Sequence, residues 1–517
     1  MKRFVILIIG LVCMHFGAMA QNPDNQQIQK LNYVYQQIRD KYVDDVPLEP
    51  LVEEAIIATL KELDPHSAYL DKEQMANLRN RLRGEYAGVG IKYVIFNDTL
   101  VVRGVVANSP AERAKLEIND RIISVDGRTI IGINPDSIPS ILKGEAGTKL
   151  SIEVKRRCEA KPLKINLKRD DIESSAISVA FRYGNVGYIS ISKFSKPLPA
   201  EFYEAYKALG NIESLIIDLR DNVGGAINSA IDLSGLFLRK GDVVVSTEGR
   251  TGCVVYDKKR DGQLLDTPLV VIINENSASA SEIFAGAMQD HDRGVIVGRT
   301  SFGKGLVQRV IDFKDGTGMC LTVSRYKTPS GRIIQRPYTM GDGDSYNRDT
   351  LRFLHPDSLP HNPNLLFKTL KLGRTIYGGG GITPDCYIAY KPTKVDTILS
   401  DMVHRGVVER IVVEYFDRVS ASDVLKCYPT LEDFASQFKL DSNAEASLEA
   451  MIADCESEVV DEIRGRIQKM ICGVIADAIY YDGAYSYIYG MSYDDAMCKA
   501  FELLFDNSKF KAILNEK

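Results

Sequence analysis

The chain has 517 residues, of which 45% are hydrophobic and 26% are charged, as in an ordinary soluble globular protein. At roughly 150 residues per domain, this length predicts about three domains. The 64 basic and 69 acidic residues give a formal net charge of −5, and no long run of either sign occurs. This distribution argues against a nucleic-acid partner, because such proteins carry a basic patch or stripe.

The first twenty residues predict a signal peptide. Residues 1–3 are Met-Lys-Arg, residues 4–16 are mostly apolar, and Ala18 and Ala20 supply the small side chains that a signal peptidase recognises. An uncleaved membrane anchor is the alternative, although the apolar run is short for a membrane span. We therefore expect an exported protein of the periplasm or cell envelope that begins at Gln21.

Four further parts follow in chain order and predict a multi-domain α/β protein. Residues 21–83 have apolar side chains at helical spacing, whereas residues 84–169 contain short apolar runs separated by Gly, Asn and Asp turns. Residues 170–392 alternate between strand-like and helical stretches, which indicates an α/β core. Within them, residues 337–376 are rich in Pro, Asp, Asn and Gly and predict a surface excursion. Residues 393–517 are helical by pattern.

Particular elements are expected in the last two parts. The predicted core strands are 186–192, 214–219, 269–273 and 295–297, and the predicted core helices are 198–209, 226–238 and 280–290. The clearest C-terminal helices are 424–438 and 444–478. Cysteines are scattered without a C-x-x-C pair, so no metal site is expected and any disulfide pairing stays open.

The segment Asn274–Glu282 has the sequence NENSASASE and lies between an apolar strand and an apolar helix. A strand-to-helix turn exposes a serine hydroxyl and directs the free N–H groups of the helix toward it, which suits a nucleophile whose reaction builds an oxyanion. Ser279 and Glu282 also have the spacing of a helix capping box. On this segment alone, the cap is favoured over the nucleophile.

A nucleophilic serine needs a base, and no histidine lies in a triad-like context; His66, His291, His355, His361 and His404 are given no chemistry. A G-x-S-x-G elbow is also absent. A lysine is an alternative base if burial lowers its pKa. The Gly-rich run Gly298–Gly305 contains Lys304 but lacks the Ser or Thr of a phosphate-binding loop and precedes a strand-like run. On its own, Lys304 is expected at the surface.

A further segment, Asp218–Gly225, ends another predicted strand with a pair of glycines. Paired glycines permit close backbone approach and can donate N–H groups to an oxyanion. A plain turn explains the segment equally well.

Taken together, these motifs resemble the C-terminal processing peptidases, a family of exported Ser/Lys endopeptidases that carry a PDZ domain. The resemblance runs from about residue 28 to residue 392. The segments that carry it are 63–67 (LDPHS), 88–90 (GVG), 125–127 (VDG), 218–225 (DLRDNVGG), 278–283 (ASASEI), 302–305 (FGKG) with Gln308, 325–332 (RYKTPSGR) and 381–385 (GITPD).

The resemblance implies a site for acyl transfer without a metal or cofactor. It makes Ser279 the nucleophile, Lys304 the base and Gln308 the residue that orients the base, and it places the oxyanion hole at the N–H groups of Gly225 and Ala280. The four-residue offset puts Gln308 on the same side of a strand as Lys304. Ser279 is thereby preferred over the neighbouring serines 277 and 281.

The same resemblance makes residues 84–169 a PDZ domain. Such a domain captures the C-terminal carboxylate of a peptide on loop N–H groups and pairs the tail as an added strand. The implied peptide-binding residues are Gly88, Val89, Gly90 and Ile91, and the two apolar side chains imply substrates with apolar C-terminal tails. We also expect that docking of a tail favours the active arrangement.

Three residues depart from the family pattern. Val223 stands where the family has proline, which predicts a less rigid loop before the glycine pair. Lys115 and Asn119 replace glycines in the turn before Asp120, where a positive φ is expected; Asn tolerates such a φ better than Lys.

The sequence therefore predicts an exported serine endopeptidase that cleaves proteins recognised by their C-terminal tails. The alternative from another class is a catalytically silent PDZ scaffold that binds protein C-termini. The implied core also resembles the ClpP and crotonase folds, so acyl-CoA chemistry is a third possibility, which the signal peptide and PDZ module disfavour. An activator or adaptor protein is a possible partner, and the oligomeric state stays open.

Overall fold

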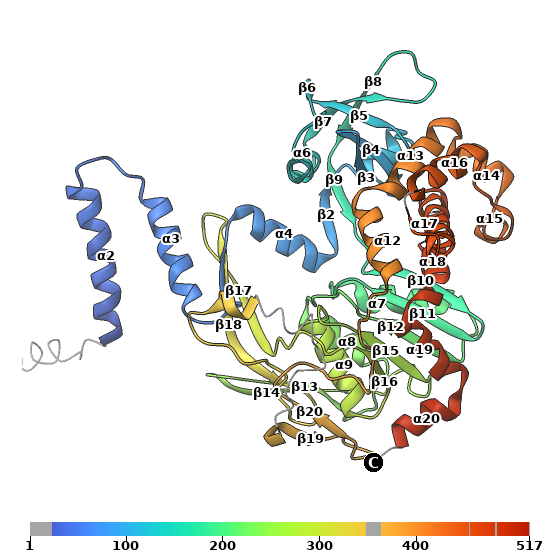
Figure 1. The fold of residues 1–517 in the computed structure, drawn as a ribbon. Helices are drawn as coiled ribbons and strands as arrows, with labels where there is room; N and C mark the ends of the chain where they lie inside the picture. Colours follow the sequence, from blue (N-terminus) through green and yellow to red (C-terminus); the bar gives the residue numbers. More distant parts are fainter. Residues whose placement is uncertain (1–22, 348–362, 454, 481–482, 516–517) are drawn as a thin grey trace, which may run out of the picture.

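The computed structural model describes residues 23–347, 363–453, 455–480 and 483–515 (Figure 1). Along the chain it contains N-terminal helices, a β-rich domain, an α/β core and C-terminal helices, which confirms the predicted class and order of parts. The predicted signal peptide and part of the predicted surface excursion lie outside the described residues.

The N-terminal helices α2 (Pro23–Lys41) and α3 (Leu48–Lys61) project from one side of the molecule (Figure 1). They lead into a short strand, β1 (Ala68–Leu70), which pairs with a distant strand of a second sheet beside the core, and into helix α4 (Lys72–Arg83). Gly84 ends α4 with a φ of 79°, the left-handed conformation that glycine adopts at no steric cost.

The β-rich domain is an antiparallel sheet around its own apolar core. A two-stranded pair, β2 and β9, leads the chain into and out of it. The elements are β2 (Glu85–Gly88), β3 (Ile91–Phe96), β4 (Thr99–Val105), α5 (Pro110–Arg113), β5 (Arg121–Val125), β6 (Arg128–Thr129), α6 (Ile138–Leu142), β7 (Lys149–Lys155), β8 (Leu163–Lys168) and β9 (Asp170–Glu173).

The core is built on a six-stranded sheet with the order β10-β11-β12-β15-β16-β21. Strands β10 and β11 are antiparallel, and the other neighbours are parallel. The strands are β10 (Ile177–Tyr183), β11 (Val186–Ile191), β12 (Ser214–Asp218), β15 (Leu269–Ile273), β16 (Val295–Gly298) and β21 (Cys386–Tyr387). The helices α7 (Leu198–Ala208), α8 (Ile227–Ser234) and α9 (Ala280–Asp290) lie where the sequence predicts core helices.

Both faces of this sheet are buried, which explains why its strands are continuously apolar. Leu215 and Ile217 pack with α7, α8 and α9, whereas Ile216 between them packs against the other face with α19 (Asp495–Phe505) and α20 (Asn507–Asn515). The C-terminal part of the chain therefore completes the core by supplying its second helical layer (Figure 1).

A second sheet lies beside the core and contains β1, β18, β13 and β14, with β17 paired to β18. Strands β19 and β20 form a separate pair. The remaining elements of this region are β13 (Val243–Gly249), β14 (Gly252–Asp257), β17 (Leu306–Asp312), β18 (Gly318–Lys327), α10 (Gly343–Asn347), β19 (Leu366–Lys368) and β20 (Thr375–Tyr377).

The other C-terminal helices stand beside both the core and the β-rich domain (Figure 1). They are α12 (Lys394–His404), α13 (Val407–Arg418), α14 (Ala421–Cys427), α15 (Leu431–Gln437), α16 (Ser442–Ile452), α17 (Val460–Tyr480) and α18 (Ala484–Gly490). In the described parts of the chain, no helix is long and apolar enough to cross a membrane.

The prediction of two long helices in this region was wrong. Residues 424–438 form two short helices because Pro429, which lacks a backbone N–H, lies between α14 and the N-cap of α15. Residues 444–478 are divided between the helices α16 and α17. This division lets both helices pack on α13 and on each other.

Candidate active site

Ser279 lies at the turn between β15 and α9, where it is the N-cap of the helix. Its φ of 57° falls in the region that favours glycine, so the backbone is strained at the residue that sequence analysis singles out. The carbonyl of Ser279 accepts a hydrogen bond from the hydroxyl of Tyr326 at 3.3 Å.

The two neighbouring serines have structural roles. Ser277 and Ser281 are fully buried, and their hydroxyl groups donate to the backbone carbonyls of Leu219 and Asn222, both at 2.8 Å. Ser279 is only half-buried. The surroundings of the three serines therefore single out Ser279 as the one with a hydroxyl available for chemistry.

Glu282 is a fully buried carboxylate that joins the two candidate catalytic segments. One of its oxygens accepts from the backbone N–H groups of Ser279 and Lys304, at 2.8 and 2.9 Å. The other accepts from the Ser301 hydroxyl and the Gly303 N–H, both at 2.6 Å. Burial raises the pKa of Glu282, and the four donors counteract this effect by stabilising the charged form.

The capping interpretation accounts for part of this arrangement. Glu282 reaches back to the N–H of Ser279, as a capping box requires, and the Glu282 N–H donates to the Ser279 carbonyl at 2.9 Å. A cap does not require the further bonds to the segment of Lys304. Glu282 thus caps the helix and also ties the proposed nucleophile to the proposed base through their backbones.

Lys304 lies in the turn before β17 and is mostly buried, contrary to the surface position expected from its segment alone. Its Nζ donates to Oε1 of Gln308 at 2.7 Å, and Nε2 of Gln308 donates to the carbonyl of His66. Burial lowers the pKa of Lys304 below its ordinary value. The lower pKa increases the fraction of neutral lysine, the form that can accept a proton.

The predicted contact between Lys304 and Gln308 is present, but the predicted reason for it was wrong. Lys304 precedes the first residue of β17, Leu306, so the two side chains do not share one face of a regular strand. The register of β17 shifts between Val307 and Gln308, which turns Gln308 out of the regular alternation.

The side chains of the proposed dyad, Ser279 and Lys304, are not hydrogen-bonded to each other in the described structure. Among the residues that the structure describes, no hydrogen bond joins Nζ of Lys304 to the Oγ of Ser279; the amine is bonded to Gln308 instead. Catalytic hydrogen bonds are often long in the absence of substrate and tighten when it binds.

The glycine loop, residues 218–225, brings a second N–H donor toward Ser279. Gly225 forms a parallel bridge with Phe194, in which the flanking residues make the hydrogen bonds: the Phe194 N–H donates to Gly224, and the Ala226 N–H donates to Phe194. The N–H of Gly225 consequently points away from Phe194. Within the described ranges, neither this N–H nor that of Ala280 has a hydrogen-bond partner.

Close packing explains the glycines of this loop. A Cβ on Gly224 would lie 2.7 Å from the carbonyl oxygen of Ala278 and 2.9 Å from the nitrogen of Ala280. A Cβ on Gly225 would lie 2.2 Å from the carbonyl oxygen of Phe194, at a φ of 153°. Only glycine lets residue 224 approach the start of α9, and residue 225 approach Phe194, this closely.

The loop is anchored by Asn222 rather than by a proline. The Asn222 side chain donates to the Ile191 carbonyl and accepts from the Gly224 N–H, both at 2.9 Å, and its own carbonyl accepts from the Ala278 N–H at 3.0 Å. Val223, which replaces the family's proline, has 48% of its surface exposed and adds no such restraint.

The contribution of residues 64–67 was not predicted from the sequence. Asp64 accepts hydrogen bonds from the hydroxyl groups of Ser67 and Thr322, which fix this segment against β18, and the His66 carbonyl holds Gln308. Burial and nearby Lys304 lower the pKa of His66 to about 4, so its ring is neutral near pH 7. The segment 63–67 was noticed as a motif, but nothing local showed that it meets residue 308.

The predicted peptide loop lies at the start of the β-rich domain. The N–H groups of Val89 and Gly90 have no partner within the described part of the chain, as a carboxylate-binding loop requires. The side chain of Val89 is only 3% exposed and packs in the domain core, and its part in an apolar pocket stays a prediction. Gly88 is buried in β2, and Ile91 is partly buried against the same core.

The unusual turn before Asp120 keeps the expected backbone. Lys115 and Asn119 have φ values of 58° and 70°, where glycine was expected. Asn119 also donates to Oδ1 of Asp417 on α13 at 2.8 Å. The replacement of glycine therefore gives the β-rich domain a side-chain contact with the C-terminal helices.

The described residues contain no group of three or more His, Cys, Asp or Glu side chains arranged to hold a metal ion.

Three family profiles match the chain. Peptidase family S41 matches residues 185–342, the PDZ domain matches residues 101–156, and the activating protease CtpB N-terminal domain matches residues 14–74.

Two curated relatives extend this similarity. The carboxy-terminal-processing protease of Bartonella bacilliformis is 34% identical over 341 residues, which cover 64% of this chain and 78% of the relative. The carboxy-terminal processing protease CtpA of Bacillus subtilis is 30% identical over 323 residues, which cover 62% and 69%. Among solved structures, a photosystem II D1 C-terminal processing protease is 28% identical over 58% of this chain and 83% of that one, with a TM-score of 0.34.

Proposed function

This chain belongs to the carboxy-terminal processing proteases of peptidase family S41, which are serine-type peptidases, and we propose that Ser279 and Lys304 form its catalytic dyad. One observation carries the proposal: the buried Glu282 carboxylate binds the backbone N–H groups of both residues, which brings two segments 25 residues apart in sequence to one site. The buried Lys304 amine and the half-buried Ser279 hydroxyl then meet the needs of a base and a nucleophile.

In the proposed reaction, neutral Lys304 takes the proton from the hydroxyl of Ser279 as Oγ attacks the peptide carbonyl. The N–H groups of Gly225 and Ala280 stabilise the negative charge on the former carbonyl oxygen. When the C–N bond breaks, protonated Lys304 gives its proton to the departing amine. The same lysine then activates the water that hydrolyses the ester, and Ser279 regains its proton.

Before this reaction, the amine of Lys304 must approach the Oγ of Ser279 while one of its N–H groups stays on Gln308. We propose that Gln308 holds the amine in place and accepts one of its N–H bonds throughout, which leaves the nitrogen lone pair free for the serine proton. Substrate binding brings the Lys304 amine and the Ser279 hydroxyl together, and docking of a tail on the PDZ domain favours this arrangement.

The remaining parts of the proposal concern where the enzyme acts and on what. We propose that the protein is exported to the periplasm or cell envelope and that its substrates have apolar C-terminal tails bound at residues 88–91. The unpartnered N–H groups of Val89 and Gly90 support capture of a carboxylate. An activator or adaptor protein stays a prediction.

The test is cleavage of an unstructured peptide with an apolar C-terminus, supplied with a free or an amidated carboxylate and read by mass spectrometry. The wild-type protein should cleave, and should cleave the free-carboxylate peptide faster. Ser279→Ala and Lys304→Ala should not cleave, whereas Lys314→Ala, an exposed lysine of the β17–β18 turn, should match the wild type. Tight binding of the free tail without cleavage would favour the PDZ scaffold instead.

A further inference from the structure

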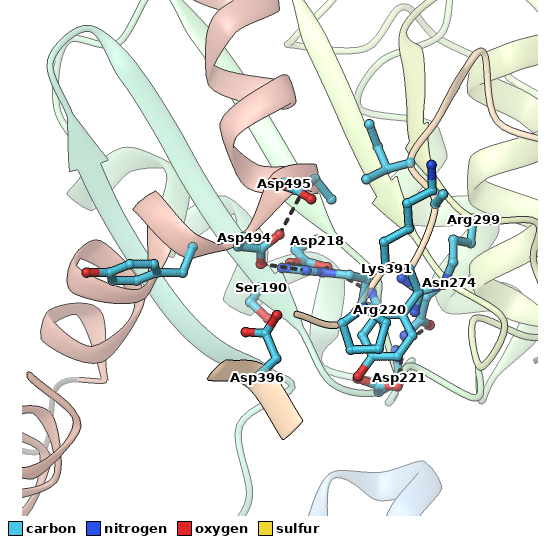
Figure 2. A pocket seen from close by; sticks show the side chains of 16 residues that line it. Ser190, Asp218, Arg220, Asp221, Asn274, Arg299, Lys391, Asp396, Asp494 and Asp495 are labelled. Carbon is cyan, nitrogen blue, oxygen red and sulfur yellow. Dashed lines mark hydrogen bonds and ion pairs between the residues drawn. The ribbon is translucent and has the colours of Figure 1, made fainter. Parts of the chain in front are cut away.

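The strongest unexplained feature outside the proposed dyad is a charged cavity of about 440 Å³ between the core and the C-terminal helices (Figure 2). It lies at the carboxyl ends of the core strands and is lined by Asp218, Arg220 and Asp221 of the glycine loop. Asp494 and Asp495, at the start of α19, line its opposite side. The cavity therefore lies where the C-terminal part of the chain meets the loop that carries Gly225.

Arg220 crosses this junction. Its guanidinium donates to both oxygens of Asp218, with Nη2 to Oδ2 at 2.6 Å, and its Nη1 donates to Oδ2 of Asp494 at 2.6 Å (Figure 2). The Arg220 and Asp494 side chains are 23% and 25% exposed, so solvent screens this pair only in part. Burial lowers the pKa of Arg220, but these two carboxylates outweigh that effect and raise the pKa above its ordinary value.

Asp494 has two tasks on its two oxygens. Oδ1 accepts from the N–H groups of Ala496 and Met497 and so caps the N-terminus of α19. Oδ2 is left for Arg220. Because α19 packs against the core sheet through its apolar face, the position of Asp494 is fixed relative to β12 and β15.

The two residues that follow Arg220, on the way to the proposed oxyanion hole, are each hydrogen-bonded to the segment of the nucleophile. The next residue, Asp221, is bonded to the side chains of Asn274 and Asn276 at 2.9 and 2.8 Å. Asn222 then bonds the segment of the nucleophile, as described above. Arg220 is thus the first anchor of the glycine loop, and the loop has no proline at residue 223 to limit its backbone.

We propose that Asp494 is a positioning residue for the glycine loop: it holds Arg220, and thereby keeps the N–H of Gly225 where the oxyanion develops. This inference rests on the proposed function of Gly225. It assigns the C-terminal helices, for which sequence analysis gave no mechanism, a part in catalysis without contact with the substrate. Asp494 differs from the loop residues because it lies 269 positions beyond Gly225 in the chain.

The decisive variant is Asp494→Asn. Asparagine is as good an N-cap as aspartate, so α19 keeps its cap while Arg220 loses one of its two charged partners and keeps Asp218. Asp495→Asn is the matched control: it is the next residue, it lines the same cavity, and no hydrogen bond or ion pair of its side chain occurs among the described residues. Cleavage of an amidated peptide is measured, so that tail capture does not enter the result.

Asp494→Asn should lower kcat about three- to tenfold with KM unchanged, which is less than the full effect of one charge-assisted hydrogen bond because only part of that effect reaches the transition state through the loop. In an Arg220→Gln background the same substitution should have no further effect on kcat. Asp495→Asn should match the wild type. An unchanged kcat in Asp494→Asn, or an equal loss with and without Arg220, would overturn the inference.

A second measurement separates this inference from the proposed function. Amide hydrogen exchange across residues 221–225 should be faster in Asp494→Asn than in Asp495→Asn, whether or not the protein cleaves the peptide. If the wild type does not cleave but exchange changes as stated, the proposed function fails and the anchoring of the loop stands. Equal exchange in the two variants would refute the anchoring itself.

Discussion

The replacement Glu282→Gln tests the arrangement on which the proposed site depends. Each carboxylate oxygen of Glu282 accepts two hydrogen bonds, and three of the four donors are backbone N–H groups that cannot turn away. Glutamine presents one oxygen and one NH₂ group. If the NH₂ group replaces the oxygen shared by Ser279 and Lys304, both of these N–H groups face a donor.

The expected cost follows from the number of bonds lost. A hydrogen bond to a charged group is worth about 1.5–3 kcal/mol, so the loss of two costs about 3–6 kcal/mol. If the whole cost fell on the transition state, kcat would fall about 10²- to 10⁴-fold. Because the same bonds also stabilise the folded site, part of the cost should appear in the free energy of unfolding, and both quantities are measured.

Glu201→Gln is the matched control for this prediction. Glu201 also accepts two hydrogen bonds, from the Ala176 N–H at 2.7 Å and the Ser175 hydroxyl at 3.1 Å, but both fall on the same oxygen, Oε2. Glutamine can keep both bonds by placing its oxygen there, so this variant should behave as the wild type. Near-normal kcat and stability in Glu282→Gln would refute the reasoning, since the four donors would then not depend on the carboxylate.

Three further predictions concern neighbouring parts of the molecule. Gln308→Glu places a carboxylate beside the Lys304 amine and should raise the pKa of that amine. Because activity requires the neutral amine, the rising limb of the pH–rate profile should move to higher pH. An unmoved limb would contradict the role of Lys304 as base. Gly225→Ala introduces a Cβ against the Phe194 carbonyl at a positive φ, so it should lower kcat without weakening tail binding, as measured by calorimetry. Arg121→Gln removes an ion pair of two hydrogen bonds, at 2.7 and 2.8 Å, to the C-terminal helices. It should change the rate of cleavage of free-tail peptides but not that of amidated peptides. Equal changes for both kinds of peptide would argue against coupling through the PDZ domain.

The fold was predictable from sequence where a local pattern decides the structure. Continuous apolar runs such as 269–273 gave core strands, and the helix at 280–290 begins and ends as expected. The cover on the second face of the sheet was not predictable, because Ile216 and the helix α19 are joined only by tertiary packing. Pro429 was visible in the sequence and should have divided the helix predicted at 424–438.

The candidate site shows a similar division. The family resemblance that the motifs carry implied that Ser279, Lys304 and Gln308 belong to one site. They did not show that the His66 carbonyl holds Gln308, or that Asp494 holds Arg220, because these contacts span 242 and 274 residues. Hydrogen bonds across such separations leave no local pattern, and only the folded chain brings their partners together.

The central claim is that Ser279 carries the acyl group during cleavage. The most direct measurement is to incubate the wild-type protein with a peptide ester, quench in acid at early times and identify the acylated residue by mass spectrometry. We expect the acyl group on Ser279, and no acylation in Lys304→Ala under the same conditions. An acyl group on Ser277 or Ser281, or turnover of the ester by Ser279→Ala at the wild-type rate, would contradict the claim.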